Sequence, residues 1–229
     1  MDDTPSGTPM RIVVLGAGPG GYVAALRAAR HGAAVTLVEK DLVGGTCLNR
    51  GCIPTKALLA SAEALAKARA GEEYGFELTG EVRPDLVRMM ERKERVVTQL
   101  RDSIEVLLKK AKVQVLRGNG RLDGPTTVTV ETADGPMTLE ADRIILATGS
   151  EPAYLPMFDF GHPAILTSTS ALELREIPSS MVIVGAGVIG CEFASLFAEL
   201  GTHITMVEMM PQMLPLEDKR LAKQFQGVY

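Results

Sequence analysis

The stretch Ile12-Val13-Val14-Leu15-Gly16-Ala17-Gly18-Pro19-Gly20-Gly21 decides the fold that this sequence predicts. Its opening run of four apolar residues, three of them β-branched, is typical of a buried parallel strand. The spacing Gly-x-Gly-x-x-Gly follows, and then comes an alanine- and leucine-rich segment that predicts a helix. In such a unit the first glycine permits a tight turn, the second lets backbone approach a pyrophosphate, and the third allows the helix to pack closely on the strand. The stretch therefore predicts a dinucleotide-binding βαβ unit.

The same pattern occurs twice. Residues 12–39 and 181–208 align without a gap at a constant offset of 169. Each copy ends on a glutamate, Glu39 or Glu208, that lies 23 positions after the first glycine of its motif. A carboxylate there can accept hydrogen bonds from ribose hydroxyls. Two copies with the acid in place are stronger evidence than a single glycine motif, and they predict two nucleotide-binding units.

The candidate nucleotide-binding residues share these two motifs and the ends of their second strands. They are Gly16, Gly18, Pro19, Gly20, Gly21, Glu39 and Lys40 in the first copy, and Gly185, Gly187, Val188, Ile189, Gly190 and Glu208 in the second. Glu208 would repel the additional phosphate of NADP and could bind the free ribose of NAD. No arginine follows in the segment 209–212, so we expect the second unit to prefer NAD.

Composition excludes several classes of protein. The chain has 229 residues, a formal net charge of -4 and three cysteines. It has no basic footprint for nucleic acid, no apolar run near the ~20 residues of a membrane helix, and too few cysteines for a secreted disulfide scaffold. The acidic, proline-containing start does not resemble a secretory signal. We expect a soluble, cytoplasmic protein with a disordered extension over residues 1–10, and neither nucleic acid nor a membrane as partner.

Between the two repeats the sequence predicts a different kind of structure. A helix carrying Lys56 should continue through Ala70, and residues 85–112 have the apolar spacing of a long amphipathic helix. Short strands are predicted at 113–116, 127–131, 137–139 and 143–147. The expected fold is α/β: two Rossmann-like units, with a helical excursion and a small antiparallel β-meander inserted before the crossover at 151–180.

The segment Gly45–Lys56 places Cys47 and Cys52 five positions apart. The two cysteines could be buried packing residues, part of a metal site, or a redox pair. Nearby glycines disfavour burial, and the absence of four clustered ligands disfavours zinc, so no metal is expected. On a regular helix these two residues would point about 140° apart. Pro54 suits the first turn of a helix, so Cys47 can lie in the preceding loop, folded back onto Cys52 near the helix amino terminus. A redox pair is therefore the favoured interpretation.

Lys56 lies four residues beyond Cys52, on the same helical face. It could be an ordinary solvent-exposed lysine, or a positive charge beside an electron-accepting ring. Cys191, inside the second predicted helix, is most simply a small buried packing residue.

The string from Gly45 to Lys56 closely resembles the active-site signature of the flavin-dependent pyridine-nucleotide disulfide reductases. Its form Cys-Leu-Asn-x-Gly-Cys-Ile-Pro is most similar to that of the dihydrolipoyl dehydrogenases. The resemblance runs from about Met10 to Gln226 and includes both glycine motifs. It implies FAD at the first motif and NAD at the second, in a fold of the three-layer ββα type. Residues 11–150 would form the FAD-binding domain and 151–229 the NAD-binding domain.

The resemblance also implies roles for individual residues. Cys47 would exchange with the substrate disulfide, and Cys52 would face the flavin. Glu192 would pair with Lys56 in an ion pair that bridges the two nucleotide units. The remaining FAD contacts implied by the family are Gly45 and Thr46 near the pyrophosphate, Gly120 at the adenine, and Thr148, Gly149 and Ser150 along the site.

Relatives in this family are roughly twice as long and form homodimers, so both nucleotide domains are expected to be incomplete and the dimerisation domain absent. The acid–base histidine of that domain has no counterpart among His31, His162 and His203. Two hypotheses remain. One is an enzyme that passes electrons from dihydrolipoamide or a lipoyl-bearing protein through Cys47–Cys52 and FAD to NAD⁺. The other is a catalytically inactive nucleotide-binding fragment, and a related reductase with another substrate is a variant of the first.

Overall fold

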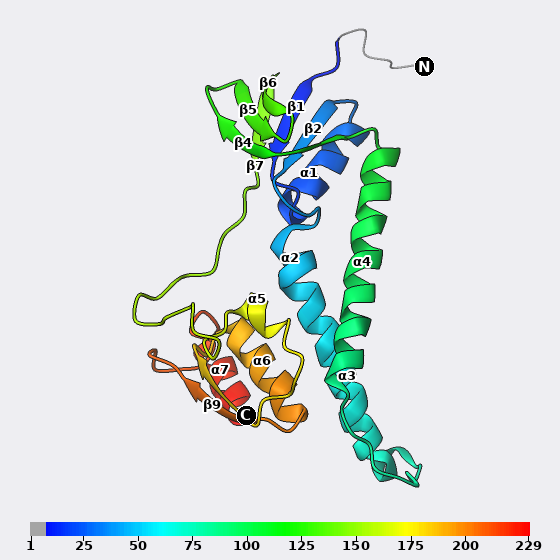
Figure 1. The fold of residues 1–229 in the computed structure, drawn as a ribbon, viewed down its shortest axis with the longest axis vertical. Coiled ribbons are helices and arrows are strands. Elements are labelled where there is room, and N and C mark those ends of the chain that lie inside the picture. Colours follow the sequence, from blue (N-terminus) through cyan, green and yellow to red (C-terminus); the bar gives the residue numbers. More distant parts are fainter. Residues whose placement is uncertain (1–7) are drawn as a thin grey trace. The chain divides into compact units, whose positions relative to one another are not determined.

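The computed structural model describes residues 8–229. Most of the extension predicted for residues 1–10 lies outside the described residues. The helices and strands, in chain order, are β1 (Arg11–Leu15), α1 (Pro19–Arg30), β2 (Ala34–Glu39), α2 (Gly45–Arg50), α3 (Cys52–Arg69), the 3-10 helix η1 (Gly71–Tyr74), α4 (Leu86–Lys110), β3 (Gln114–Arg117), β4 (Asn119–Leu122), β5 (Thr127–Thr132), β6 (Gly135–Glu140), β7 (Arg143–Leu146), α5 (Ser168–Ala171), β8 (Ser180–Val184), α6 (Val188–Glu199), β9 (His203–Val207) and α7 (Lys219–Gln226) (Figure 1).

The chain divides into two compact units. Of the described residues, 8–53 and 97–158 form the first, and 54–96 and 159–229 form the second. The sequence-based division at residue 150 had placed 54–96 in the first unit. The structure assigns this helical hairpin to the second unit instead, because its buried residues, among them Leu58 and Met90, pack with Phe193 and Phe197 of α6 in one hydrophobic cluster.

The first unit is built on a parallel sheet of four strands in the order β3-β2-β1-β7. In the central strand, Val14 is paired with Leu37 of β2 on one side and Ile145 of β7 on the other. A strand buried on both faces needs apolar residues at successive positions, and Val13, Val14 and Leu15 are all at most 4% exposed. This explains the unbroken apolar run from which the strand was predicted.

The two faces of this sheet support different layers. On one face, Val14 and Leu37 form a cluster with Ala25 of α1 and Leu108 of α4. On the other face, Val13, Leu15 and Val38 form a cluster with residues of β5. That strand is the middle one of the antiparallel sheet β4-β5-β6. The unit is therefore a ββα sandwich, as the predicted fold class required.

The second unit contains the second βαβ repeat. Strands β8 and β9 are parallel, with Ile183 paired to Met206. Exposure alternates along both strands. Met181, Ile183 and Ile204 pack against the cluster that contains α6, whereas Val182 and Val184 are more than half exposed. Helices of this unit therefore cover one face of its two-stranded sheet, and the other face is exposed.

Most predicted elements are confirmed within a residue or two. The sequence did not predict the short helices α2 and α5, the 3-10 helix η1 or the strand β4. The residues of β4, Asn119-Gly120-Arg121-Leu122, contain one apolar side chain and lack a period-2 pattern. Pairing with β5 alone places it in the meander. Among residues 8–229, no helix is long and apolar enough to cross a membrane.

Candidate redox and nucleotide-binding sites

The first glycine loop connects β1 to α1, and sterics dictate its composition. Gly16 has φ +96°, and a Cβ there would lie 2.2 Å from the carbonyl oxygen of Ala147. A Cβ at Gly21 would lie 1.7 Å from the carbonyl oxygen of Gly16. The loop therefore needs glycine at the first and third positions of the motif.

Helix α1 begins directly at this loop with Pro19 in its first turn. Its N-cap, Gly18, supplies no side-chain acceptor, and the first turn carries no acidic residue. Amides of a first turn have no partner within their helix, and together with the helix dipole they favour an anion. Without a carboxylate of its own here, α1 presents a suitable place for a phosphate group.

Glu39 lies at the end of β2, where its buried carboxylate binds two backbone amides. Oε2 accepts a hydrogen bond from the Ala17 amide (2.6 Å), and Oε1 accepts one from the Asp41 amide (2.8 Å). The predicted acid is thus brought to the glycine loop, which it also holds in place. A carboxylate has about four acceptor positions, so two amide bonds leave capacity for ribose hydroxyls.

The second motif repeats this geometry. Gly185 has φ +104°, and a Cβ at Gly190 would lie 2.0 Å from the carbonyl oxygen of Gly185. Glu208 accepts hydrogen bonds from the amides of Ala186 (2.7 Å) and Met210 (2.8 Å). The hydrogen bonds to these amides lower the pKa of Glu208 from its usual 4.5, and the bond from Met210 has the larger effect. The carboxylate is therefore charged at neutral pH.

The start of α6 matches that of α1. Its N-cap, Gly187, has no side-chain cap, and its first turn has no acidic residue. Val188 and Ile189 are both about 60% exposed there. All residues predicted for the second nucleotide site therefore lie on one loop and the adjoining helix and strand ends.

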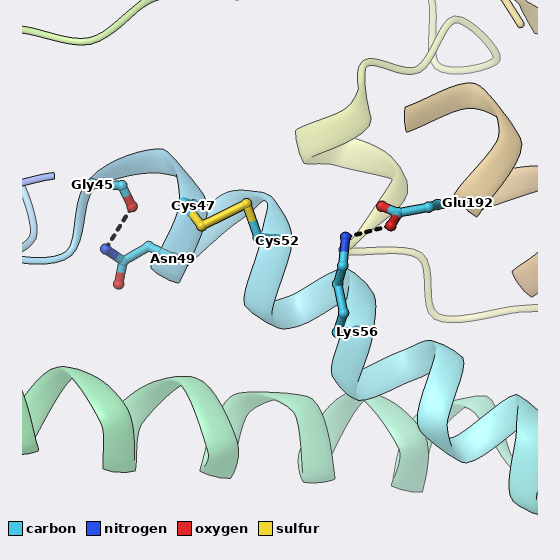
Figure 2. The surroundings of a disulfide bond; sticks show 6 residues. All are labelled: Gly45, Cys47, Asn49, Cys52, Lys56 and Glu192. Carbon is cyan, nitrogen blue, oxygen red and sulfur yellow. Dashed lines mark hydrogen bonds and ion pairs between the residues drawn. A yellow bond between two sulfur atoms is a disulfide. The ribbon is translucent and has the colours of Figure 1, made fainter. Parts of the chain in front are cut away.

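Cys47 and Cys52 form a disulfide, with their Cα atoms 4.6 Å apart (Figure 2). The sequence placed Cys47 in a loop, and this was wrong: it lies within the short helix α2. The helical path is interrupted at Gly51, with φ −144° and ψ −105°, before α3 begins at Cys52. This interruption brings together two cysteines that a continuous helix would keep apart. Cys47 is half-buried and Cys52 is exposed, so the bond is accessible.

Gly45 connects the disulfide segment to the first glycine loop. It has φ +60°, and a Cβ on it would lie 2.6 Å from the Cα of Gly18. The first residue of α2 and the N-cap of α1 therefore meet backbone to backbone. This contact places the redox segment beside the candidate phosphate site of the same unit.

The predicted ion pair between Lys56 and Glu192 is present (Figure 2). Lys56 Nζ donates to Glu192 Oε1, joining α3 to α6. Both residues belong to the second compact unit. The predicted bridge between the units is therefore corrected to a contact within one unit, because α3 packs with α6 beyond Ile53. The lysine side chain is 56% exposed and the glutamate 24%.

Several remaining predicted residues lie near the loop in the first unit. Thr148, Gly149 and Ser150 follow β7 and are exposed, with Gly149 at φ +78°. Lys40 Nζ lies 3.5 Å from Glu151 Oε1, in an exposed pair. Thr46 is exposed on α2.

The structure gives Gly120 a packing role that the sequence did not predict. A Cβ at Gly120 would lie 2.6 Å from Leu15 Cδ2 and 3.2 Å from Val38 Cγ1. Glycine there lets β4 approach the parallel sheet. This packing explains why position 120 is a glycine without the predicted adenine contact.

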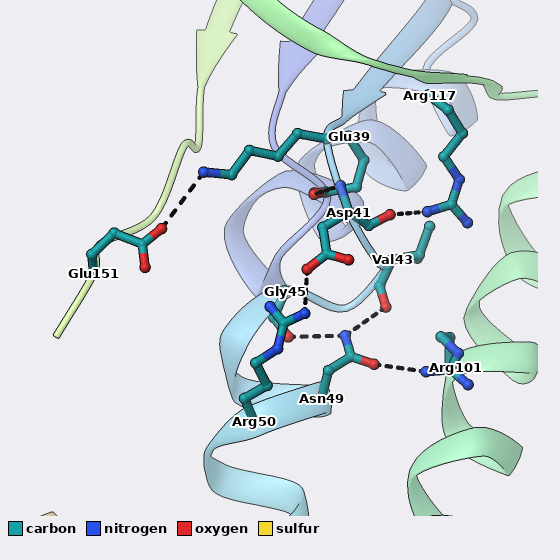
Figure 3. A network of polar contacts seen from close by, with 10 residues as sticks. Glu39, Asp41, Val43, Gly45, Asn49, Arg50, Arg101, Arg117 and Glu151 are labelled. Carbon is teal, nitrogen blue, oxygen red and sulfur yellow. Dashed lines mark hydrogen bonds and ion pairs between the residues drawn. The ribbon is translucent and has the colours of Figure 1, made fainter. Parts of the chain in front are cut away.

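Sequence reasoning missed Asn49, which lies between the two cysteines. Its Nδ2 donates to the carbonyl oxygens of Val43 and Gly45, each at 3.0 Å, and its Oδ1 accepts from Arg101 Nη1 at 3.1 Å (Figure 3). The only signal of it in the sequence was an amide side chain between the two cysteines. Within residues 8–229, no group of three or more His, Cys, Asp or Glu side chains is placed to hold a metal ion.

Comparison with known proteins matches residues 10–229 to the model of the pyridine nucleotide-disulphide oxidoreductase family. The chain is 45% identical over 218 residues to a dihydrolipoyl dehydrogenase of Bacillus subtilis (95% of this chain, 48% of the relative). It is 47% identical over 213 residues to one of Chlamydia muridarum (92% and 45%). The chain thus spans about half the length of the curated relatives it matches.

Solved structures agree with these sequence matches. The crystal structure of LpdA from Mycobacterium tuberculosis superposes with a TM-score of 0.87 at 31% identity, covering 96% of this chain and 49% of that one. The HOCl-induced flavoprotein disulfide reductase RclA from Escherichia coli, in its Cu(II) complex, gives 0.81 at 30% (97% and 47%). With the disulfide and both glycine loops, these matches show that the chain belongs to the pyridine nucleotide-disulphide oxidoreductase family.

Proposed function

We propose that this chain contains the disulfide redox centre and both nucleotide-binding motifs of a dihydrolipoyl dehydrogenase-type flavoprotein. The observation that carries the proposal is the Cys47–Cys52 disulfide, whose helix α2 contacts the first glycine loop through Gly45 and Gly18. A reversible disulfide beside a dinucleotide loop is suited to two-electron transfer between thiols and a bound redox cofactor.

The residues of the first unit fit FAD. The loop has the glycines that close backbone approach requires, α1 begins with no side-chain cap, and Glu39 retains acceptor capacity for a ribose. Gly16, Gly18 and Gly21 would hold the pyrophosphate, with Glu39 on the ribose. When bound, FAD would supply a two-electron carrier between the disulfide and a nicotinamide nucleotide.

The second motif fits NAD. Its loop repeats the first one, and the lowered pKa of Glu208 keeps a negative charge on the acid that would bind the ribose in such a motif. That charge would repel the 2′-phosphate of NADP. We therefore propose NAD⁺ as the acceptor.

The two cysteines would perform thiol–disulfide exchange with the substrate. A thiolate of dihydrolipoamide attacks Cys47 Sγ, and Cys52 leaves as a thiolate. The second substrate thiol then attacks the mixed disulfide, which releases lipoamide and leaves two reduced cysteines. Lys56 would add a positive charge one helical turn beyond Cys52. A lipoyl substrate is favoured over other disulfides, because the matched relatives at 45–47% identity are dihydrolipoyl dehydrogenases.

A cytoplasmic location and a homodimeric whole protein belong to the same proposal. The homodimer rests on the family, and the location rests on the low cysteine count, which suits a reducing compartment. The competing candidate is a nucleotide-binding fragment without turnover.

The first test is the visible absorption spectrum of the purified chain after addition of FAD and removal of the excess. Flavin bands in near-stoichiometric amount would support the first site. Anaerobic addition of NADH should then raise the thiols that a maleimide labels under denaturing conditions from one, Cys191, to three. The Cys52→Ser variant is the control and should show no such increase. A flavin-bearing chain whose thiols stay at one would favour the fragment, and a chain that binds no flavin would contradict the proposal.

A further inference from the structure

We propose that Asn49 is a positioning residue for the redox disulfide, and that Arg101 of α4 fixes its orientation. This inference rests on the proposed redox function of Cys47–Cys52. Two of the three side-chain hydrogen bonds of Asn49 join α2 to Val43 and to Arg101, and the third, to Gly45, lies within α2. We refer to them together as the Asn49 clamp.

The first part of the clamp fixes the start of α2. Asn49 Nδ2 donates to the carbonyl oxygen of Gly45 within the helix and to that of Val43 before it. Val43 is completely buried in the core of the first unit. The amide thus anchors the helix that carries Cys47 to a rigid part of the fold.

The second part of the clamp fixes the amide itself. An amide side chain can be turned over, which would exchange its donor and its acceptor. Arg101 Nη1 donates to Asn49 Oδ1 at 3.1 Å, and only the oxygen can accept that bond (Figure 3). Arg101 also contacts Thr98 Oγ1 at 3.4 Å on its own helix. The arginine therefore directs the NH₂ group towards the two carbonyl oxygens.

The clamp should favour the oxidised state of the cysteine pair. Reduction replaces the S–S bond by a contact between two thiols, which must separate to van der Waals distance. Cys47 then moves away from Cys52, and the clamp opposes this because it holds α2 in the arrangement that the disulfide requires. Removing the clamp should therefore make the disulfide easier to reduce.

The test is the equilibrium between the chain and glutathione buffers of varied ratio, in the absence of nucleotides. The reaction is balanced: protein disulfide and two glutathione thiols give two protein thiols and one glutathione disulfide. The reduced fraction is read from maleimide labelling, in which Cys191 adds one constant thiol. The variants are Asn49→Ala, Arg101→Met and both together. The control is Arg95→Met, the same change at an exposed position of α4.

We expect Asn49→Ala and Arg101→Met each to lower the equilibrium constant for disulfide formation by about tenfold, equivalent to about 30 mV for this two-electron couple. The double variant should match Asn49→Ala alone, because Arg101 acts through the amide, and Arg95→Met should match the wild type. Wild-type values in both single variants would overturn the inference. Additive effects in the double variant would overturn the role given to Arg101.

Circular dichroism checks that each variant is folded. If Asn49→Ala does not fold, Arg101→Met still decides the inference, since it retains the aliphatic part of a half-buried side chain. A wild-type disulfide that glutathione cannot reduce reversibly would instead contradict the proposed redox function itself.

Discussion

Replacing Gly45 by alanine tests the contact that joins the redox segment to the first glycine loop. Its φ of +60° lies in the left-handed region, which costs a residue with a Cβ about 1–2 kcal/mol. The new Cβ would also lie 2.6 Å from the Cα of Gly18, which is backbone and cannot turn away. Such overpacking costs about 1–3 kcal/mol more. We therefore expect Gly45→Ala to lower the free energy of unfolding by about 2–5 kcal/mol in total.

Gly32→Ala separates the two contributions. Gly32 lies in the same unit and has φ +85°, but a Cβ there would meet nothing within 4 Å. Its cost should therefore be that of the backbone conformation alone, about 1–2 kcal/mol. Urea denaturation followed by circular dichroism gives the free energy of unfolding of each variant. Equal losses in Gly45→Ala and Gly32→Ala would refute the close approach of α2 to the N-cap of α1.

Three further changes test other parts of the structure. Phe197→Ala should lower the free energy of unfolding of the second unit by about 3–5 kcal/mol in urea, because its ring is fully buried; a loss below about 1 kcal/mol would contradict the assigned core. Glu208 has a lowered pKa, so its stabilising contribution is present above its usual pKa of 4.5 and is lost as the pH falls further. The gap in melting temperature between wild type and Glu208→Gln should be present at neutral pH and close below pH 4.5; a gap that is unchanged in stronger acid would count against the two amide bonds. Lys56→Met should change stability by less than about 1 kcal/mol, since the lysine side chain of that pair is 56% exposed; a larger loss in urea would mean that the pair is desolvated.

The sequence predicted those features that leave a local pattern of residue types along the chain. Residues 12–15 could be read as a buried strand because both faces of β1 are covered. The glycines could be read as a loop because their spacing is visible in the sequence, and the structure leaves no room for a Cβ at Gly16 or Gly21. The amphipathic pattern of residues 85–112 predicted α4, because a helix repeats its buried face every few residues.

Features that depend on distant contacts were harder to predict. The assignment of residues 54–96 to the second unit depends on Leu58 and Met90 packing with α6, which no local pattern records. The helix around Cys47 was missed because Gly51 interrupts the helical path, and a glycine in sequence does not state which φ and ψ it adopts. Asn49 was missed because its partner Arg101 lies 52 positions away.

The internal repeat extends further than the glycine spacing from which it was recognised. In both copies the terminal glutamate accepts a hydrogen bond from the amide 22 positions before it, Ala17 for Glu39 and Ala186 for Glu208. A bond that recurs at the same place in two copies indicates a shared requirement of the loop. The copies differ beyond the second strand, because only the first continues into Gly45 and the cysteine pair. The difference in chemistry between two otherwise similar nucleotide motifs is therefore assigned to that short segment, and the Asn49 clamp acts on it.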